Sequence, residues 1–560
     1  MSFLINKGTA ALIFVIVILC TNSNASEINS YIPIPDTEVA LHIKERISRG
    51  IAYSKKTIWG EQVYSAVLVE SFYKGRNCQP AWSHDGHLMQ VEMLMKAVDE
   101  AYGDGLSPAY YHLARIRSLV DNTGGELSPC PNRLADLDIL LTDAFITLGC
   151  HLSAGCVNPV AVASEWFAKG GKVDVSSLLE QALKKKQIRE ALIGLRPEKG
   201  IYTRLRSALA HYRELALKGE WPLLSGGPSM KKGFKYDGVV ELRKRLAASG
   251  DLRADEAIGG SIFDDRLEQS LILFQKRHGL KADGVVGRDT RNALNVPLKQ
   301  RIHQMELNME RLRWILGILE ERFIIVNIAD FQLSLIEKDK PILSMKVVVG
   351  KPYQSTPIFT AKMTYIVINP SWNIPDSIAR KEILKKIVKN PLYLAEQNIE
   401  VLEGRGPRER GIEPDTIDWS KVTGQPLRYR FRQKPGSLNA LGQLKFMLPN
   451  SYDIYLHDTP AKRLFSENVR TFSHGCIRVE KPIELAEYML RDDLRWTRDA
   501  LIAAMDKGTE QVVQIPQPVN VHFLYLTAWV DEGDTLQFRN DIYGRDKLLD
   551  EALRKKPYIQ

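Results

Sequence analysis

The spacing of apolar residues changes along the chain and divides it into stretches of different structure. Before residue 233, apolar positions recur every three or four residues, a spacing that predicts amphipathic helices. The clearest run consists of Leu134, Leu137, Leu141, Phe145 and Leu148. We therefore expect residues 26–232 to form a helical N-terminal domain.

A compact unit of three short helices is predicted for residues 233–296. Its first helix ends at Gly250 and its second at Gly279, because glycine commonly follows the last helical turn. The third helix ends near Leu294. Residues 297–322 then predict one long linker helix, whose apolar positions are Ile302, Met305, Met309, Leu312, Leu316 and Leu319.

From Phe323 onward the pattern is typical of β-strands, with β-branched residues and little charge. A mainly-β, sandwich-like domain is expected over residues 323–530, interrupted by a charged insertion at 375–436 that would act as a lid over the mouth of a site. Residues 531–560 are expected to form a hairpin and a polar tail. The predicted strands are Phe323–Ile328, Phe331–Ile336, Ile342–Val349, Thr364–Asn369, Leu444–Met447, Tyr452–Leu456 and Val519–Val530, with Leu536–Arg539 pairing with the last. The whole chain is thus a multidomain α+β protein.

The N-terminus has the pattern of a secretory signal. Lys7 precedes an apolar run from Ala10 to Cys20, and small residues near Ala25 offer a cleavage site. A membrane-spanning helix needs about 20 apolar residues, so this shorter run predicts a signal peptide over residues 1–25. We expect an exported protein of the periplasm or cell envelope, with an uncleaved membrane anchor as the alternative.

Composition and charge narrow the partners only slightly. The 560 residues carry a formal charge of +9, with 44% hydrophobic and 26% charged residues, which is ordinary for globular domains. The sequence has no nucleic-acid-binding signature, and a mild basic excess does not indicate such a partner. The basic excess suits an anionic partner such as a cell-wall polymer.

Six cysteines are present, and export would permit disulfides among them. Cys20 lies in the signal, and four others fall between residues 78 and 156, which allows three pairings. Our expected pairing is Cys150–Cys156 with Cys78–Cys130. Cys476 would then remain an unpaired thiol.

Residues 452–479, YDIYLHDTPAKRLFSENVRTFSHGCIRV, hold the candidate chemistry. A strand ending in His457, a polar loop and a return segment carrying Cys476 would bring an imidazole and a thiol together. The imidazole could take the thiol proton and leave a stabilised ion pair, with the thiolate as nucleophile. Two other hypotheses remain open, namely a buried structural cysteine and a zinc site of His457, His474 and Cys476.

The same segment resembles the signature of L,D-transpeptidases of the YkuD type, and the chain layout resembles their large, YcbB-like members. The resemblance implies that Cys476 is the acylated nucleophile and His457 the general base. It implies a frame around the nucleophile that orients substrate and oxyanion. The positions of this frame are Ser473, where the family takes Ser or Thr, His474, Gly475 and Arg478, with the carbonyl of Asp458 orienting the imidazole. Backbone amides near Gly475 and Cys476 would hold the oxyanion.

A second resemblance covers residues 233–296. The sequences FQKRHGL, from Phe274, and DGVVG, from Asp283, resemble those of the small three-helix peptidoglycan-binding domain. The N-terminal helical region is similar in position to the scaffold domain of the large transpeptidases, and the insertion at 375–436 is similar in position to their capping subdomain.

These resemblances imply an enzyme that cross-links peptidoglycan stem peptides through a Cys thioester, with no cofactor and no metal. Its partners would be stem peptides and glycan, peripheral to the cell wall, and not nucleic acid. Trp372 and Tyr455 are candidate substrate contacts, although Trp372 could equally be a hinge anchor. The alternatives are an L,D-carboxypeptidase or amidase using the same Cys–His pair, an enzyme attaching a protein to the wall, and a non-catalytic wall-binding scaffold.

Overall fold

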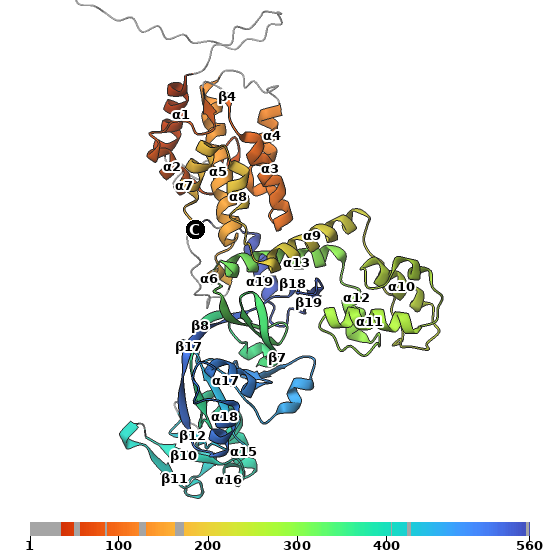
Figure 1. The fold of residues 1–560 in the computed structure, drawn as a ribbon, viewed down its shortest axis with the longest axis vertical. Coiled ribbons are helices and arrows are strands. Elements are labelled where there is room, and N and C mark those ends of the chain that lie inside the picture. The colour runs from red at the N-terminus through yellow and green to blue at the C-terminus, as the bar shows by residue number, and fades with distance from the viewer. Residues whose placement is uncertain are drawn as a thin grey trace, which may run out of the picture.

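The molecule is elongated, with helices at one end and a sheet-rich part at the other (Figure 1). The computed structural model describes residues 35–49, 57–84, 87–121, 130–162, 173–317, 319–404, 406–422, 427–555 and 559. The predicted signal peptide, residues 1–25, lies outside the described residues. The predicted multidomain α+β architecture is confirmed.

The N-terminal part is a bundle of helices with two short strand pairs. Its helices are α1 Asp36–Ser48, α2 Ala66–Gly75, α3 Val91–Ala101, α4 Leu113–Asp121, α5 Pro131–Ala154, α6 Pro159–Val162, α7 Val175–Lys185, α8 Ile188–Ile193 and α9 Gly200–Leu217. Strands β1 Thr57–Ile58 and β2 Glu61–Gln62 form one pair, and β3 Ser83–His84 and β4 His87–Leu88 form the other.

Helix α5 is the centre of this bundle. The sequence predicted one apolar face, but every residue from Leu134 to Leu152 is buried, because neighbouring helices surround α5. Within the described residues, α5 alone has the length and hydropathy of a membrane-spanning helix, and 89% of that apolar stretch is buried inside the protein. It is the core helix of a folded domain.

The expected disulfides are absent, since all five described cysteines are free thiols. Cys150 is buried in the core of the helical bundle. Gly155, at φ 89°, then turns the chain away, and the amide of Cys156 donates to Glu310 Oε1 at 2.6 Å. The turn therefore directs Cys156 toward the linker helix. The predicted pairs Cys150–Cys156 and Cys78–Cys130 are wrong for this structure.

The three predicted helices of the compact unit are present, and the linker helix forms but ends at Leu316, six residues before its predicted end. The unit contains α10 Gly238–Ala248, α11 Asp265–Arg277 and α12 Arg288–Leu294 around their own apolar core. Its DGVVG turn is held by Gln275, whose Oε1 accepts the amide of Gly284 at 2.9 Å and whose Nε2 donates to the Val285 carbonyl at 3.0 Å. Helix α13, Leu298–Leu316, follows and crosses the middle of the molecule beside α9 (Figure 1).

One sheet dominates the rest of the chain. Its order is β15-β7-β16-β14-β13-β8-β17-β5-β6, and β6 also pairs with β7, so the two ends of the sheet meet at β7. The predicted mainly-β domain is therefore built from a single sheet that closes on itself. Its strands are β5 Arg322–Asn327, β6 Gln332–Glu337, β7 Lys340–Gly350, β8 Phe359–Ile368, β13 Leu444–Met447, β14 Leu456–His457, β15 Thr471–Ser473, β16 Ile477–Val479 and β17 Gln511–Leu524. Helices α17 Pro482–Leu490 and α18 Arg498–Asp506 complete its core.

Three strands differ by more than two residues from their predicted extents. Strand β8 starts five positions early, because exposed Lys362 interrupts its apolar pattern without ending the pairing. Strand β17 starts eight positions early, where a register shift between Gln514 and Val519 accommodates its two prolines, and it ends at Leu524 and not at Val530. Instead of a strand from Tyr452, a turn held by Asn450 leads into the two-residue β14.

The charged insertion forms a small domain with its own sheet and apolar core. Strands β9 Trp372–Ile374, β10 Ile399–Glu403, β11 Arg410–Ile412 and β12 Tyr429–Gln433 pair in the order β11-β10-β12-β9. Helices α14 Asp376–Ile378, α15 Leu384–Lys389 and α16 Tyr393–Glu396 pack on it, with a π-helical turn at Ala379–Ile383 between the first two. We call residues 372–433 the capping subdomain.

The C-terminal residues are folded onto the linker helix. Strands β18 Ala528–Val530 and β19 Leu536–Phe538 form the predicted hairpin. The predicted polar tail is wrong, because α19 Arg545–Leu553 follows and its Leu549 is fully buried.

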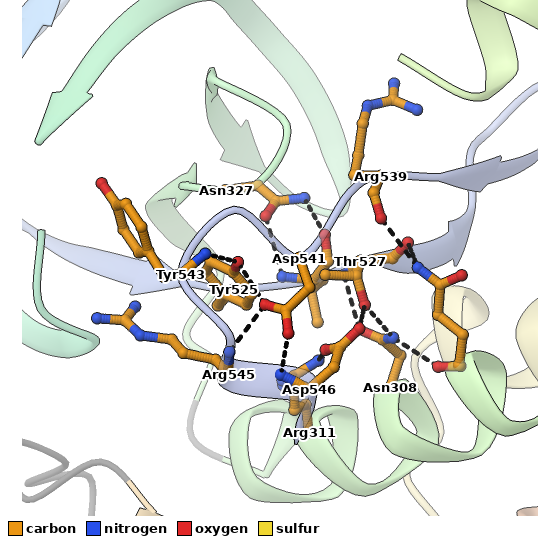
Figure 2. Close-up of polar contacts among 12 residues, drawn as sticks. Asn308, Arg311, Asn327, Tyr525, Thr527, Arg539, Asp541, Tyr543, Arg545 and Asp546 are labelled. Carbon is orange, nitrogen blue, oxygen red and sulfur yellow. Dashed lines mark hydrogen bonds and ion pairs between the residues drawn. The ribbon is translucent and has the colours of Figure 1, made fainter. Parts of the chain in front are cut away.

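Side-chain hydrogen bonds fix the start of α19 (Figure 2). The Asp541 carboxylate accepts the amides of Arg545 and Asp546 at 2.8 and 2.9 Å, which satisfies two free amides of the first turn. The Asp546 carboxylate in turn binds Arg311 of the linker helix at 2.5 Å and the Thr527 hydroxyl at 2.8 Å. The C-terminal segment therefore ties the linker helix to the sheet.

Candidate active site

The predicted nucleophile and base lie on one face of two neighbouring strands. Strands β14 and β16 pair in parallel, with His457 opposite Arg478. Side chains alternate along a strand, so Tyr455 shares the side of His457, and Cys476 shares that of Arg478. The fold thus gathers four of the predicted site residues.

His457 is buried and oriented by the backbone. Its Nδ1 donates to the carbonyl of Asp458 at 2.5 Å, so in the neutral ring Nε2 carries the lone pair. Burial, and next the charge of Arg478, lower the pKa of His457 to about 3. The imidazole is neutral at neutral pH and is able to accept a proton.

The thiol of Cys476 is also neutral at rest. Burial raises its pKa, while the Tyr455 amide, the Lys445 charge and the Tyr455 hydroxyl each oppose that rise. Its sulfur contacts the carbonyl of Asp453 at 3.7 Å rather than His457. The resting pair is therefore thiol and imidazole, in contrast to the ion pair expected from the sequence.

The Asp453 carbonyl reaches the sulfur from a turn. Its φ is 55°, in the left-handed region that aspartate adopts more readily than most residues other than glycine. Here the Asn450 side chain holds the turn by accepting the amides of Tyr452 and Ile454.

The turn from Ser473 to Cys476 is held by side-chain hydroxyls. The Ser473 hydroxyl donates to the Cys476 carbonyl at 2.6 Å and accepts the Gly475 amide at 3.1 Å. Gly475 has φ 121°, and a Cβ there would lie 3.2 Å from Ile454 Cδ1. Thr356 donates its hydroxyl to the Gly475 carbonyl at 2.7 Å.

This turn alters the expected oxyanion site. The Gly475 amide is already bound to Ser473, so it is not free to donate. The Cys476 amide makes no hydrogen bond to any described residue. Of the two predicted donors, the Cys476 amide is the one available for a developing negative charge.

His474 contacts the capping subdomain. Its Nε2 bonds Glu382 Oε1 at 2.6 Å. Glu382 lies in the π-helical turn, and such turns frequently occur at functional sites. Glu382 of the capping subdomain therefore contacts His474, which lies two residues before Cys476.

The residues of the zinc hypothesis do not converge on one point. His474 binds Glu382, and Nδ1 of His457 binds a backbone carbonyl. In the part of the chain that the structure describes, no three His, Cys, Asp or Glu side chains are grouped so that they could hold a metal ion.

The remaining predicted residues surround the pair. The Asp458 carboxylate binds Lys462 at 2.5 Å and the Gln443 amide at 3.1 Å, so only its carbonyl serves the imidazole. Arg478 has a buried Nε with no hydrogen-bond partner among the described residues. Trp372 packs against the core of the capping subdomain, and its indole reaches the Tyr455 hydroxyl.

Three residues that sequence reasoning missed also belong to the site. Lys445 lies directly across from His457 on β13, and its amine is 4.0 Å from the centre of the Tyr455 ring. In the sequence, Lys445 could have been noticed as a lone lysine between the apolar residues Leu444 and Phe446. Glu382 is the one acid in a run of cations, whereas nothing in the sequence distinguishes Thr356.

Three parts of the chain match known domain families. Residues 321–515 match the L,D-transpeptidase catalytic domain model, YkuD. Residues 235–294 match the model described as "Putative peptidoglycan binding domain". Residues 67–209 match the scaffold domain model.

A relative and two solved structures illustrate the similarity. A Haemophilus influenzae protein named "Putative L,D-transpeptidase" is 35% identical over 251 residues, which are 44% of this chain and 49% of that protein. The alignment therefore spans about half the length of the relative. A Mycobacterium smegmatis L,D-transpeptidase is 12% identical with a TM-score of 0.16, covering 36% of this chain and 58% of that one. A Stackebrandtia nassauensis L,D-transpeptidase is 14% identical with a TM-score of 0.18, covering 54% and 96%.

Such low TM-scores carry no argument about the fold, so the assignment rests on the family models and the curated relative. Residues 321–515 are similar to the L,D-transpeptidase catalytic domain of the YkuD family, and other parts of the chain are similar to a scaffold domain and to a putative peptidoglycan-binding domain.

Proposed function

We propose that this protein is exported to the cell envelope and forms cross-links between peptidoglycan stem peptides through a thioester on Cys476. The observation that carries the proposal is the arrangement of Cys476 and His457 on one face of paired strands, within a YkuD domain. The imidazole is neutral, and its Nε2 carries the lone pair that would accept the thiol proton as the sulfur attacks.

In the first half-reaction, Cys476 attacks the carbonyl of the diaminoacyl residue in a tetrapeptide stem, and His457 accepts the thiol proton. The Cys476 amide stabilises the oxyanion, while Lys445 and the Tyr455 hydroxyl stabilise the sulfur as it gains charge. The carbon–nitrogen bond to the terminal D-amino acid breaks, and His457 passes the proton to the departing amine.

In the second half-reaction, the amine of another stem attacks the thioester. His457 takes a proton from this amine and returns it to the sulfur as the carbon–sulfur bond breaks. Arg478, with its buried Nε lacking a partner among the described residues, binds a carboxylate of the donor stem in this scheme.

Product analysis tests the proposal. Purified residues 26–560 are incubated with muropeptide tetrapeptides, and products are identified by mass spectrometry. Cross-linked dimers that lack one terminal D-amino acid support transpeptidation. Tripeptide as the sole product would instead identify an L,D-carboxypeptidase, and unchanged substrate would favour a wall-binding scaffold.

A further inference from the structure

The helical segment at residues 376–389 of the capping subdomain lies next to the nucleophile motif. Its contact is the hydrogen bond of 2.6 Å between Glu382 and His474. The segment packs into the capping subdomain through Ala379, Ile383 and Ile387, which are all buried. The hydrogen bond to His474 and the buried apolar residues together fix which side of the segment faces the catalytic domain.

Lysines follow Glu382 on that same side. Lys385, Lys386 and Lys389 come three, four and seven residues after Glu382, and residues at these spacings share one side of a helix. All three are exposed. The Lys386 amine bonds the Tyr393 hydroxyl at 3.3 Å. Lys385 and Lys389 form no ion pair with any acidic residue in the described ranges.

Some exposed cations of the subdomain are neutralised, as in the pairs that Arg410 and Arg428 make with Glu403. Lys385 and Lys389 are not, and they belong to the segment that contacts the nucleophile motif. The segment thus presents uncompensated positive charge next to the nucleophile motif, and such charge attracts anionic ligands.

We propose that Lys385 and Lys389 bind carboxylates of the acceptor stem peptide and guide it to the thioester. This inference rests on the proposed function. A peptidoglycan stem carries several carboxylates, so its negative charge complements the positive charge of Lys385 and Lys389. The donor stem has to reach the sulfur itself, where Lys445 and Arg478 already supply positive charge. Lys385 and Lys389 lie three and seven residues after Glu382, the residue that binds His474, so they suit a second stem peptide and not the one on the sulfur.

Equilibrium binding tests the proposal without any catalysis. In a Cys476→Ala background, the Lys385→Gln/Lys389→Gln double variant is compared with the parent for binding a tripeptide stem, which lacks the terminal D-amino acid and so serves only as an acceptor. We expect its Kd to rise about three- to tenfold at low salt. The difference should vanish in about 0.5 M salt, where such charges are screened.

The matched control is Lys184→Gln/Lys185→Gln, which removes two exposed charges from the remote helix α7. It should bind the tripeptide as the parent does. Equal affinity of the Lys385→Gln/Lys389→Gln variant and of this control for the tripeptide overturns the proposal. An equal loss of affinity for a tetrapeptide whose side-chain amine is acetylated, so that it serves only as a donor, overturns the acceptor assignment. Failure of the wild-type protein to form an acyl-enzyme refutes the proposed function instead, because the binding measurement does not depend on Cys476.

Discussion

Thr356 donates its hydroxyl hydrogen to the carbonyl of Gly475 at 2.7 Å, immediately before the predicted nucleophile. The same hydroxyl accepts the amide of Gly350 at 3.0 Å, and Thr356 is fully buried. Its own carbonyl accepts Nη2 of Arg545 at 2.8 Å. The position of the Cys476 turn is therefore set by the β7–β8 loop and, through it, by the C-terminal segment.

Replacing Thr356 with valine should slow acylation of Cys476 about tenfold. Valine keeps the shape but leaves the Gly475 carbonyl and the Gly350 amide without their partner, which costs about 1–3 kcal/mol of stability. Acylation is followed by intact-protein mass spectrometry, and stability by urea unfolding. Thr364→Val on β8 is the control, because its buried hydroxyl has no hydrogen-bond partner in the described part of the chain. Equal acylation by both variants would contradict this role.

Glu382→Gln should weaken the connection between the capping subdomain and the nucleophile turn. A neutral amide forms a weaker hydrogen bond with His474 than a carboxylate does, by about a factor of two in energy. We expect hydrogen exchange across α15 to accelerate and the KM for the donor to rise about fivefold. Glu413→Gln, at an exposed position of the same subdomain, should change neither quantity. Unaltered exchange in Glu382→Gln would show that the bond does not hold the subdomain in place.

His457 should make the protein less stable in acid. Its pKa is about 3 in the folded protein and about 6.5 in an unfolded chain. Between these values the unfolded chain binds a proton that the folded protein does not, so the free energy of unfolding falls as the pH falls from 6.5 toward 3. His457→Gln removes this contribution, which amounts to about 3 kcal/mol between pH 7 and pH 4. Urea unfolding at both pH values measures the slope. An identical slope in the variant would rule out the lowered pKa.

Lys445 should stabilise the thiolate of Cys476. Removing its charge with Lys445→Met should shift the pH midpoint of Cys476 alkylation by iodoacetamide upward, whereas Lys445→Arg should largely restore it. Lys362→Met, on the exposed side of β8, is the control. A midpoint that stays in place in Lys445→Met would leave Lys445 with a packing role against the Tyr455 ring only.

The helices and most strands could be predicted because their apolar spacing is set by local structure. Helix α13 follows its three- and four-residue spacing to Leu316. Prediction failed where tertiary contacts decide the outcome. Strand β17 continues through two prolines at a register shift, and α19 forms because Asp541 caps it and α13 binds it. A sequence pattern contains neither contact.

At the candidate site, the motif identified the residues that lie close together in sequence, from Ser473 to Arg478 and around His457. Thr356, Glu382 and Lys445 reach the same place from distant strands and from an insertion, so only the fold brings them there. The protonation states were also outside the reach of the sequence, because burial of His457 and Cys476 decides them.

The most direct test of the account is to locate the acyl group. The protein is incubated with a tetrapeptide stem, digested, and sequenced by tandem mass spectrometry, with Cys476→Ala and His457→Gln treated alongside. The account predicts a stem acyl group, lacking its terminal D-amino acid, on Cys476 of the wild type, none on Cys476→Ala, and slow formation on His457→Gln. An acyl group on another residue, or its formation at the full rate in His457→Gln, would contradict the proposed Cys–His mechanism.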